Sequence, residues 1–194
     1  MRYYKKLIGK KCYLSPINID DAEKYLAWLC DLEVSIYFKI LSQQLTIEKE
    51  KEILTTMSKN QHQTFGIIDI KTDKLIGNCS LFSIDKIDRK AEFGIFIGDK
   101  NYWGKGYGTE AGKLIVDYGF NALNIHSIML ETYSFNKRAI KSYEKIGFKV
   151  IGKRREAKII GKKKFDVIYM DILSHEFESV YIKKLLEKIE DENM

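Results

Sequence analysis

The sequence has few of the residues that build metal sites, disulfide frameworks and domain linkers. Its 194 residues include one proline, three cysteines and three histidines. The cysteines (Cys12, Cys30 and Cys79) are scattered and never spaced as C-x-x-C, so we expect reduced core side chains rather than a disulfide or zinc framework. The histidines are equally far apart along the chain. We therefore expect no metal site.

Long hydrophobic runs are also missing. No apolar stretch approaches the roughly 20 residues that a membrane span requires, and no apolar segment follows the first residues as it would in a signal peptide. We therefore expect a cytoplasmic protein with no membrane partner. The formal net charge of +6 favours anionic partners, such as a phosphate-bearing cofactor or RNA. Charge alone does not separate these two.

Hydrophobic periodicity and capping signals predict one domain over residues 1–173 and a tail helix within residues 174–194. Strands are predicted at 11–17, 64–70, 74–84, 90–97, 127–133, 148–156 and 164–173, and helices from about residue 20 and at 47–58, 108–121, 137–146 and 174–190. Thr46 and Asn136 are the expected caps of two of these helices, and Gly147 is the expected end of one. This order is typical of an α/β protein with a mixed sheet.

The most informative stretch is the glycine-rich loop between the strand at 90–97 and the helix at 108–121, where Gly104, Gly106 and Gly108 alternate with other residues. Alternating glycines let the backbone turn sharply and direct N–H groups into one concavity, and the helix behind adds its unpaired amides and positive dipole end. This combination is typical of a pyrophosphate site, to which Thr109 adds a hydroxyl. The spacing fits neither a Walker loop nor a dinucleotide fingerprint. A tight turn without a ligand is the alternative.

Two segments resemble one known family. The loop W-G-K-G-Y-G-T-E-A at 103–111 resembles the acyl-CoA-binding motif Q/R-x-x-G-x-G/A of the GNAT acyltransferase superfamily. The segment N-K-R-A-I-K-S-Y-E-K-I-G-F at 136–148 resembles the family's N-x-x-A-x-x-x-Y-x-x-x-G-F segment. Trp103 stands where the family has Gln or Arg, so one contact of the loop differs. The chain looks most like the ribosomal-protein N-terminal acetyltransferases and the spermidine acetyltransferases.

The resemblance implies a GNAT-like α/β fold with a mixed, mostly antiparallel central sheet flanked by helices, here with an extra C-terminal helix. It implies an N-acetyltransferase that moves an acetyl group from acetyl-CoA to a primary amine without a metal. The residues that it implies for cofactor binding are Ile95, Phe96, Ile97, Trp103, Gly104, Lys105, Gly106, Tyr107, Gly108, Thr109, Asn136 and Tyr143. Backbone N–H groups near 95–97 are the implied donors to the acyl carbonyl.

Tyr143 and Asn136 have both an implied role and a structural alternative. Tyr143 matches the family tyrosine that protonates the leaving thiolate, and it also shares a helical face with Ala139 and Ile140, where it would be a core residue. Asn136 is expected to contact the pantetheine arm of the cofactor or a nearby water. A role as a helix cap alone would also explain the asparagine at this position.

Glu92 is the best candidate for the general base. By strand alternation its side chain shares a face with a glycine and with Phe96, which leaves space for an amine or a bridging water. An exposed glutamate that pairs with Arg89 or Lys90 is the alternative, and Glu131 on the following strand is the second-choice carboxylate. A weak base suffices for an α-amine with a pKa near 8, because roughly 10% of it is neutral at pH 7.

The acceptor is the least specified part of the prediction. We expect a protein or peptide N-terminal amine, with Trp28, Tyr37 and Phe38 around its pocket. The alternatives are a small-molecule amine (an amino sugar, an aminoglycoside or a polyamine) and a non-catalytic acyl-CoA-binding sensor. The segment 153–164 holds seven basic residues and one acid, so it is a solvated turn or contacts an anionic acceptor, the cofactor 3′-phosphate or RNA. Without interleaved aromatic residues, nucleic acid is the weakest of these.

The predicted tail helix carries an apolar stripe. Its members are Phe177, Tyr181, Leu185 and Ile189. An apolar stripe on an otherwise charged helix buries itself against another surface. We expect this helix to pack on the domain or on the second subunit of a homodimer.

Overall fold

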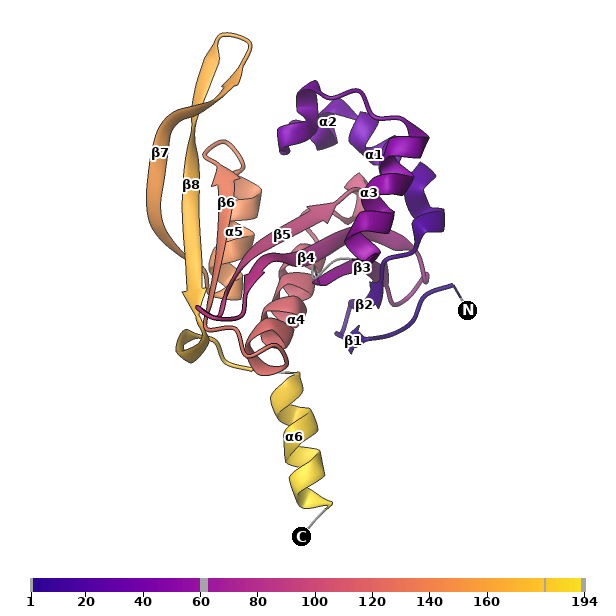
Figure 1. Cartoon of the computed structure of the whole chain (residues 1–194), viewed down its shortest axis with the longest axis vertical. Helices are drawn as coiled ribbons and strands as arrows, with labels where there is room; N and C mark the ends of the chain where they lie inside the picture. Colours follow the sequence, from indigo (N-terminus) through magenta and orange to yellow (C-terminus); the bar gives the residue numbers. More distant parts are fainter. Residues whose placement is uncertain (1, 60–62, 180, 193–194) are drawn as a thin grey trace.

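Eight strands form the central sheet in the part of the chain that the computed structural model describes, residues 2–59, 63–179 and 181–192. In their order across the sheet they are β1 (Leu7–Ile8), β2 (Cys12–Pro16), β3 (Gln63–Asp69), β4 (Leu75–Asp85), β5 (Lys90–Ile97), β6 (Ser127–Tyr133), β8 (Lys163–Leu173) and β7 (Lys149–Ile160) (Figure 1). Neighbouring strands are antiparallel except β5 and β6, which are parallel. The expected mixed, mostly antiparallel sheet is confirmed.

Helices cover both faces of this sheet. The covering helices are α1 (Ala22–Cys30), α2 (Leu32–Ser35), α3 (Ile47–Lys59), α4 (Tyr107–Asn121) and α5 (Lys137–Ile146), and a further helix, α6 (Ile182–Asp191), follows the last strand. The first three pack on one face, where Tyr25 and Leu54 share a core with Phe96 of β5. α4 and α5 cover the other face, where Ile115 shares a core with Phe93. β5 therefore contributes to both cores, as alternation along a strand requires.

Most predicted elements lie within two residues of their expected bounds. The three predicted helix signals are also confirmed: Thr46 Oγ1 accepts from the Lys49 N–H, Asn136 Oδ1 accepts from the Ala139 N–H, and Gly147 ends α5 with φ +121°. Two short elements, β1 and α2, were not predicted. The closing hairpin is longer than expected, since β7 continues to Ile160 before the turn at Gly161.

The prediction of a continuous tail helix over 174–190 was wrong. A 3-10 turn covers Ser174–Glu176 and α6 begins at Ile182, while residue 180 lies outside the described residues. The reason is a long-range contact: the buried Asp117 carboxylate of α4 accepts hydrogen bonds from the N–H groups of Tyr181 and Ile182. An acceptor at these first amides sets the start of the helix there.

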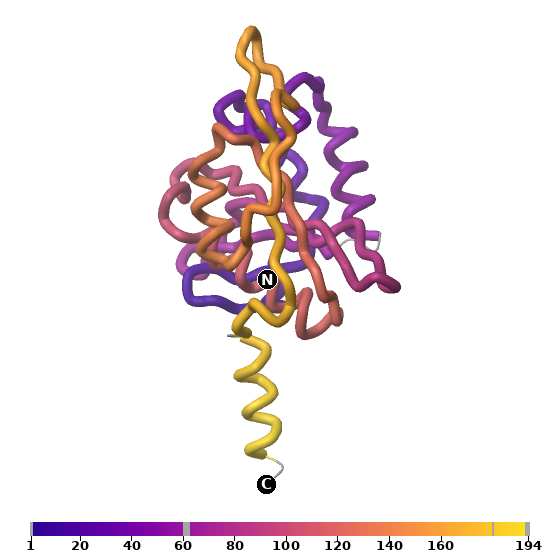
Figure 2. The backbone as a smooth tube through the Cα atoms, turned by 90° about the vertical axis from the view of Figure 1, so that its left-hand side faces the viewer, coloured from indigo at the N-terminus to yellow at the C-terminus, as the bar shows by residue number. Residues whose placement is uncertain are grey.

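Two segments extend from the domain at opposite ends. The β7–β8 hairpin rises toward the end of the molecule where α2 lies, and α6 projects from the other end (Figures 1 and 2). Phe177 and Tyr181 pack against the core, whereas Leu185 and Ile189 of α6 are about half exposed. Packing of this helix on a partner subunit stays a prediction.

The feature that positions the site is the divergence of β5 from β6. Their parallel pairing runs from Lys90 opposite Ser127 to Glu92 opposite Met129, and it goes no further among the described residues. β5 nevertheless continues to Ile97 and β6 to Tyr133. Beyond Glu92 the two strands leave a split in the sheet.

Candidate active site

A cavity of about 650 Å³ lies at this split. Phe93 and Tyr143 line it from the face that α4 and α5 cover, and Phe96 lines it from the opposite face. The cavity therefore passes through the sheet. We call its two ends the loop end, which is lined by Gly104, Gly106, Gly108, Thr109 and α5, and the α2 end, which is lined by Val34, Phe38, Lys39, Phe82, Glu92 and Glu131.

The glycine loop has the conformation that its sequence predicts. Gly104 and Gly106 have φ of +71° and +87°, a region in which glycine alone is unstrained. Gly106 is the N-cap of α4, so the first amides of that helix and its positive dipole end open on the cavity. A Cβ atom at Gly104 would meet no atom within 4 Å, which leaves open space over the loop. This arrangement fits a pyrophosphate group.

Not every predicted residue of the loop faces the cavity. The Tyr107 hydroxyl donates to Asp69 at 2.9 Å and the Lys105 carbonyl accepts from the Lys11 ammonium, and neither Lys105 nor Tyr107 lines the cavity. For these two residues the cofactor prediction rests on their backbone amides alone. Thr109 does line the cavity, and its hydroxyl lies 2.8 Å from the Ser142 hydroxyl of α5.

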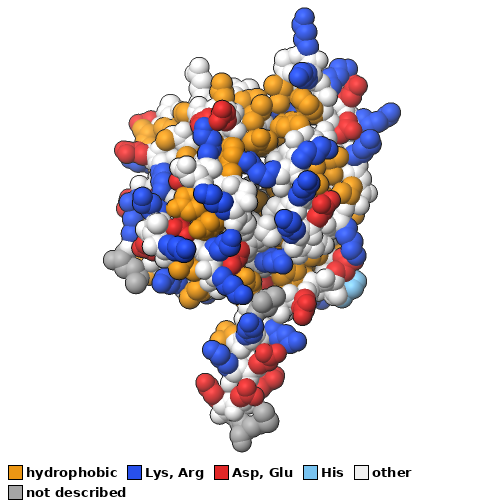
Figure 3. All heavy atoms as spheres, turned by 180° about the vertical axis from the view of Figure 1, so that it is seen from behind, with side chains coloured by type: hydrophobic (Ala, Val, Ile, Leu, Met, Phe, Trp, Pro, Cys, Tyr) orange, Lys and Arg blue, Asp and Glu red, His pale blue; other side chains and the backbone are white. Residues whose placement is uncertain are grey.

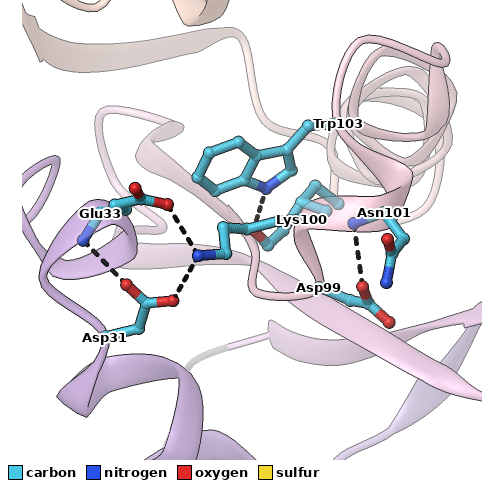
Figure 4. A network of polar contacts seen from close by, with 7 residues as sticks. Asp31, Glu33, Asp99, Lys100, Asn101 and Trp103 are labelled. Carbon is cyan, nitrogen blue, oxygen red and sulfur yellow. Dashed lines mark hydrogen bonds and ion pairs between the residues drawn. The ribbon is translucent and has the colours of Figure 1, made fainter.

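Polar contacts hold the loop on both sides. The Glu110 carboxylate of α4 accepts from the backbone N–H groups of residues 10–12. On the other side the Lys100 ammonium lies 2.7 Å from both Asp31 and Glu33, which ties the residues before the loop to α2 (Figure 4). The loop is thereby preorganised for a ligand.

The loop end also carries cations that the sequence analysis missed. Arg138, Lys141 and Lys145 of α5 line the cavity, and the Arg138 guanidinium lies 3.8 Å from the centre of the Trp103 ring. Spacings of three and four residues on one helix were a signal that could have found them. Lys and Arg side chains are numerous on the face seen in Figure 3. Cations beside a helix N-terminus fit the phosphates of coenzyme A.

The backbone of β5 directs two of the three predicted amides into the split. Ile97 lies opposite Gly77 of β4, and the Gly98 N–H donates to the Ile76 carbonyl. In an antiparallel ladder this makes Ile97 and Ile95 the residues whose N–H groups point away from β4, toward β6. The Phe96 N–H points to β4 instead, so this residue contributes its ring to the cavity. Ile95 and Ile97 remain the predicted oxyanion donors.

Tyr143 lies inside the cavity between aromatic rings. It is 8% exposed, its ring packs edge-on against Phe93 and Phe148, and no described residue forms a hydrogen bond with its hydroxyl. Burial raises the pKa of Tyr143 to about 12, so that its hydroxyl stays protonated at neutral pH. Asn136 lines the same cavity while it caps α5. Both residues combine the structural role with a position that a ligand can reach.

The α2 end holds two carboxylates and one ammonium. Glu92 lines this end, and its carboxylate has no hydrogen bond or ion pair with any described residue. The alternative partners are engaged elsewhere: Arg89 donates to the Asn124 carbonyl and Lys90 pairs with an aspartate. Glu131 is paired with Lys39, which the sequence analysis did not single out.

The predicted aromatic residues divide between pocket and core. Tyr37 and Phe38 line the cavity as expected. Trp28 does not: its half-buried ring packs edge-on against Phe96 and closely against Gly98, so it packs against the core of the α1–α3 face instead of lining the pocket.

Comparison with known proteins assigns the family. A family model described as "Acetyltransferase (GNAT) domain" matches residues 11–149, which include β2 to β6 and the glycine loop. The chain belongs to the GNAT acetyltransferase family. The predicted family, fold and activity are confirmed, and the enzyme is an acetyl-CoA-dependent N-acetyltransferase.

Similar proteins include two bacterial N-acetyltransferases and one solved structure. "Probable N-acetyltransferase YjcK" of Bacillus subtilis is 32% identical over 166 residues, which cover 80% of this chain and 90% of that one. Spermidine N(1)-acetyltransferase of Escherichia coli is 38% identical over 101 residues, 52% of this chain and 54% of that one. The crystal structure of spermidine N-acetyltransferase from Vibrio cholerae in complex with CoA and spermine superposes with a TM-score of 0.77 at 26% identity, over 87% and 98% of the two chains.

In the described part of the acetyltransferase, no helix is both long and apolar enough to cross a bilayer. In the same residues no group of three or more His, Cys, Asp or Glu side chains is arranged to hold a metal ion.

Proposed function

We propose that the acetyltransferase acts on a primary amine with a single positive charge, with a protein or peptide N-terminal amine as its acceptor. The observation that carries this proposal is the cavity through the sheet, with Tyr143 inside it and the unpaired Glu92 at its α2 end. In this arrangement the cofactor binds from the loop end and the amine enters from the α2 end. The thioester then lies in the split between β5 and β6.

Each residue has a defined task in this proposal. The glycine loop and the α5 cations hold the phosphates of the cofactor, and the amides of Ile95 and Ile97 donate to the carbonyl oxygen as negative charge develops on it. Glu92 accepts the proton that the amine loses as its nitrogen bonds to the acetyl carbon, directly or through one water. Tyr143 donates its proton to the sulfur as the carbon–sulfur bond breaks. The products are an amide and a thiol.

The charge at the α2 end favours an α-amine. Because Lys39 neutralises Glu131, Glu92 is left as the base for the acceptor. One weakly basic carboxylate serves an α-amine with a pKa near 8 much better than a lysine side chain near 10.4, of which only about 0.04% is neutral at pH 7.

A small-molecule amine is the second candidate acceptor. The names of the Escherichia coli and Vibrio cholerae relatives, which are spermidine acetyltransferases, favour it.

The test is a pair of matched peptides incubated with acetyl-CoA and the enzyme. Both contain one lysine, placed far from the N-terminus so that the α-amine is the one charge near the site, and one has a free N-terminus while the other is blocked there. Mass spectrometry with fragmentation is expected to find acetyl groups on the α-amine of the first and none on the second. Modification of the lysine alone, or of spermidine but neither peptide, would contradict the proposed acceptor.

A further inference from the structure

The α2 end of the cavity contains an ion pair between two side chains of the protein. The Lys39 ammonium pairs with the Glu131 carboxylate, and both residues line the cavity. Glu131 lies two residues beyond Met129, which is the partner of Glu92, so both carboxylates lie on the same face along the split. The hydrogen bond that the Lys39 ammonium donates to the Glu131 carboxylate raises the pKa of Lys39, which is charged at neutral pH.

The backbone around Lys39 is held in place although its side chain is exposed. The Phe38 ring packs edge-on against Phe96 of β5, and the Phe38 carbonyl accepts from the Lys158 ammonium of the hairpin. Lys39 itself begins a 3-10 turn, Lys39–Ser42. Its side chain is 77% exposed, which puts the ammonium at the mouth of the cavity rather than deep inside it.

Lys39 places an ammonium group on a carboxylate next to the general base. A bound polyamine would place its own second ammonium group at the same position. A polyamine bound with one amine at Glu92 would direct its second charge along the split to Glu131, where Lys39 already lies. Lys158 adds a further cation at this mouth, since its ammonium lies 4.9 Å from the centre of the Tyr133 ring. Like charges brought together at a binding site cost affinity.

We propose that Lys39 is a specificity-determining residue that takes, on Glu131, the place of a second acceptor ammonium, so that the enzyme accepts monoamines and rejects polyamines. The proposal rests on the function proposed above, which puts the acceptor at the α2 end. It assigns to Lys39 the exclusion of a second positive charge on the acceptor and no role in the transfer step.

The experiment compares the unmodified enzyme with Lys39→Met, Lys39→Arg and the double variant Lys39→Met/Glu131→Gln. Calorimetry measures spermidine binding to the CoA-loaded proteins, and kcat/KM is measured for spermidine and for a monoamine peptide. Lys39→Met is expected to strengthen spermidine binding and raise its kcat/KM about tenfold, because a cation is removed and a carboxylate is exposed. Lys39→Arg keeps the charge and is expected to change neither.

The double variant decides whether Glu131 is the site that Lys39 occupies. Without the carboxylate the gain for spermidine is expected to disappear. Lys49→Met is the matched control, because Lys49 is also exposed and paired with a glutamate but lies outside the cavity. This control is expected to leave spermidine binding and the kcat/KM of both acceptors unchanged.

Two results would overturn the proposal. One is spermidine binding by the unmodified enzyme as tight as that by Lys39→Met, and the other is a gain that survives in the double variant. Calorimetry separates this failure from that of the proposed function. A protein that acetylates no amine contradicts the proposed function, while the binding of spermidine to the CoA-loaded variants still tests Lys39.

Discussion

The Arg138 guanidinium lies 3.8 Å from the centre of the Trp103 ring, and both residues line the cavity. Trp103 occupies the loop position at which the family motif has Gln or Arg. Here the cation comes from α5 instead and lies over the indole, whose N–H donates to the Ile97 carbonyl at 2.7 Å. The loop, the end of β5 and the start of α5 are thereby connected around the cavity.

Arg138→Ala is expected to weaken CoA binding about tenfold, because a phosphate-side cation is lost together with its cation–π contact. Calorimetry with CoA measures the affinity, and Trp fluorescence reports the changed environment of Trp103. Lys137→Ala is the control, since Lys137 neighbours Arg138 but does not line the cavity. Equal affinity of the two variants would show that Arg138 does not contact the cofactor.

Gly106→Glu is expected to abolish CoA binding while the domain remains folded. Its backbone has a φ of +87°, which strains any other residue, and a carboxylate there repels the phosphates. The control is Gly152→Glu, because a Cβ atom at Gly152 meets no atom within 4 Å and its φ is not positive. Retained CoA affinity in Gly106→Glu, with an unchanged circular dichroism spectrum, would exclude the loop as the phosphate site.

Tyr143→Phe is expected to lower kcat about 100-fold with little change in CoA affinity, because it removes only the proton donor. Since burial raises the pKa of Tyr143 to about 12, the hydroxyl stays protonated from pH 7 to 10, and kcat is expected not to fall through loss of this acid in that range. Tyr118→Phe, outside the cavity, is the control. Unchanged turnover in Tyr143→Phe, or an alkaline fall near pH 10 that only this variant lacks, would contradict the assignment.

Glu92→Gln is expected to reduce kcat/KM most at low pH, where little of the amine is neutral and a base contributes most. The pH profile from 6 to 9 measures this effect. Glu131→Gln is the comparison. Because Glu131 is paired with Lys39, this substitution is expected to lower kcat/KM for a monoamine less than Glu92→Gln does. A loss in Glu92→Gln that does not vary with pH would assign Glu92 to positioning of the acceptor rather than to proton removal.

The sequence predicts the elements whose signals are local. β5, β6 and α5 have the expected bounds because strand alternation, the Asn136 cap and the terminal Gly147 act within a few residues. The start of α6 was missed because it depends on Asp117, more than 60 residues earlier in the chain. Propensity alone contains no information about such a contact.

The same distinction between local signals and long-range contacts applies to the residues of the site. Tyr143, Asn136 and the three glycines of the loop (Gly104, Gly106 and Gly108) lie in contiguous motifs, and all of them line the cavity. The pairing of Lys39 with Glu131 joins residues 92 positions apart and depends on where the turn after α2 meets β6. The direction of the Tyr107 side chain, toward Asp69, likewise depends on β3. Neither contact has a sequence signal of its own.

The most direct test of the account is release of free thiol from acetyl-CoA by the enzyme and by Tyr143→Phe, with and without amine. The panel contains an N-terminal peptide, spermidine, an aminoglycoside and an amino sugar. We expect rapid release with the peptide, slow release with spermidine, none without amine, and a loss of about 100-fold in the variant. Release that needs no amine, or turnover that Tyr143→Phe leaves intact, would contradict it.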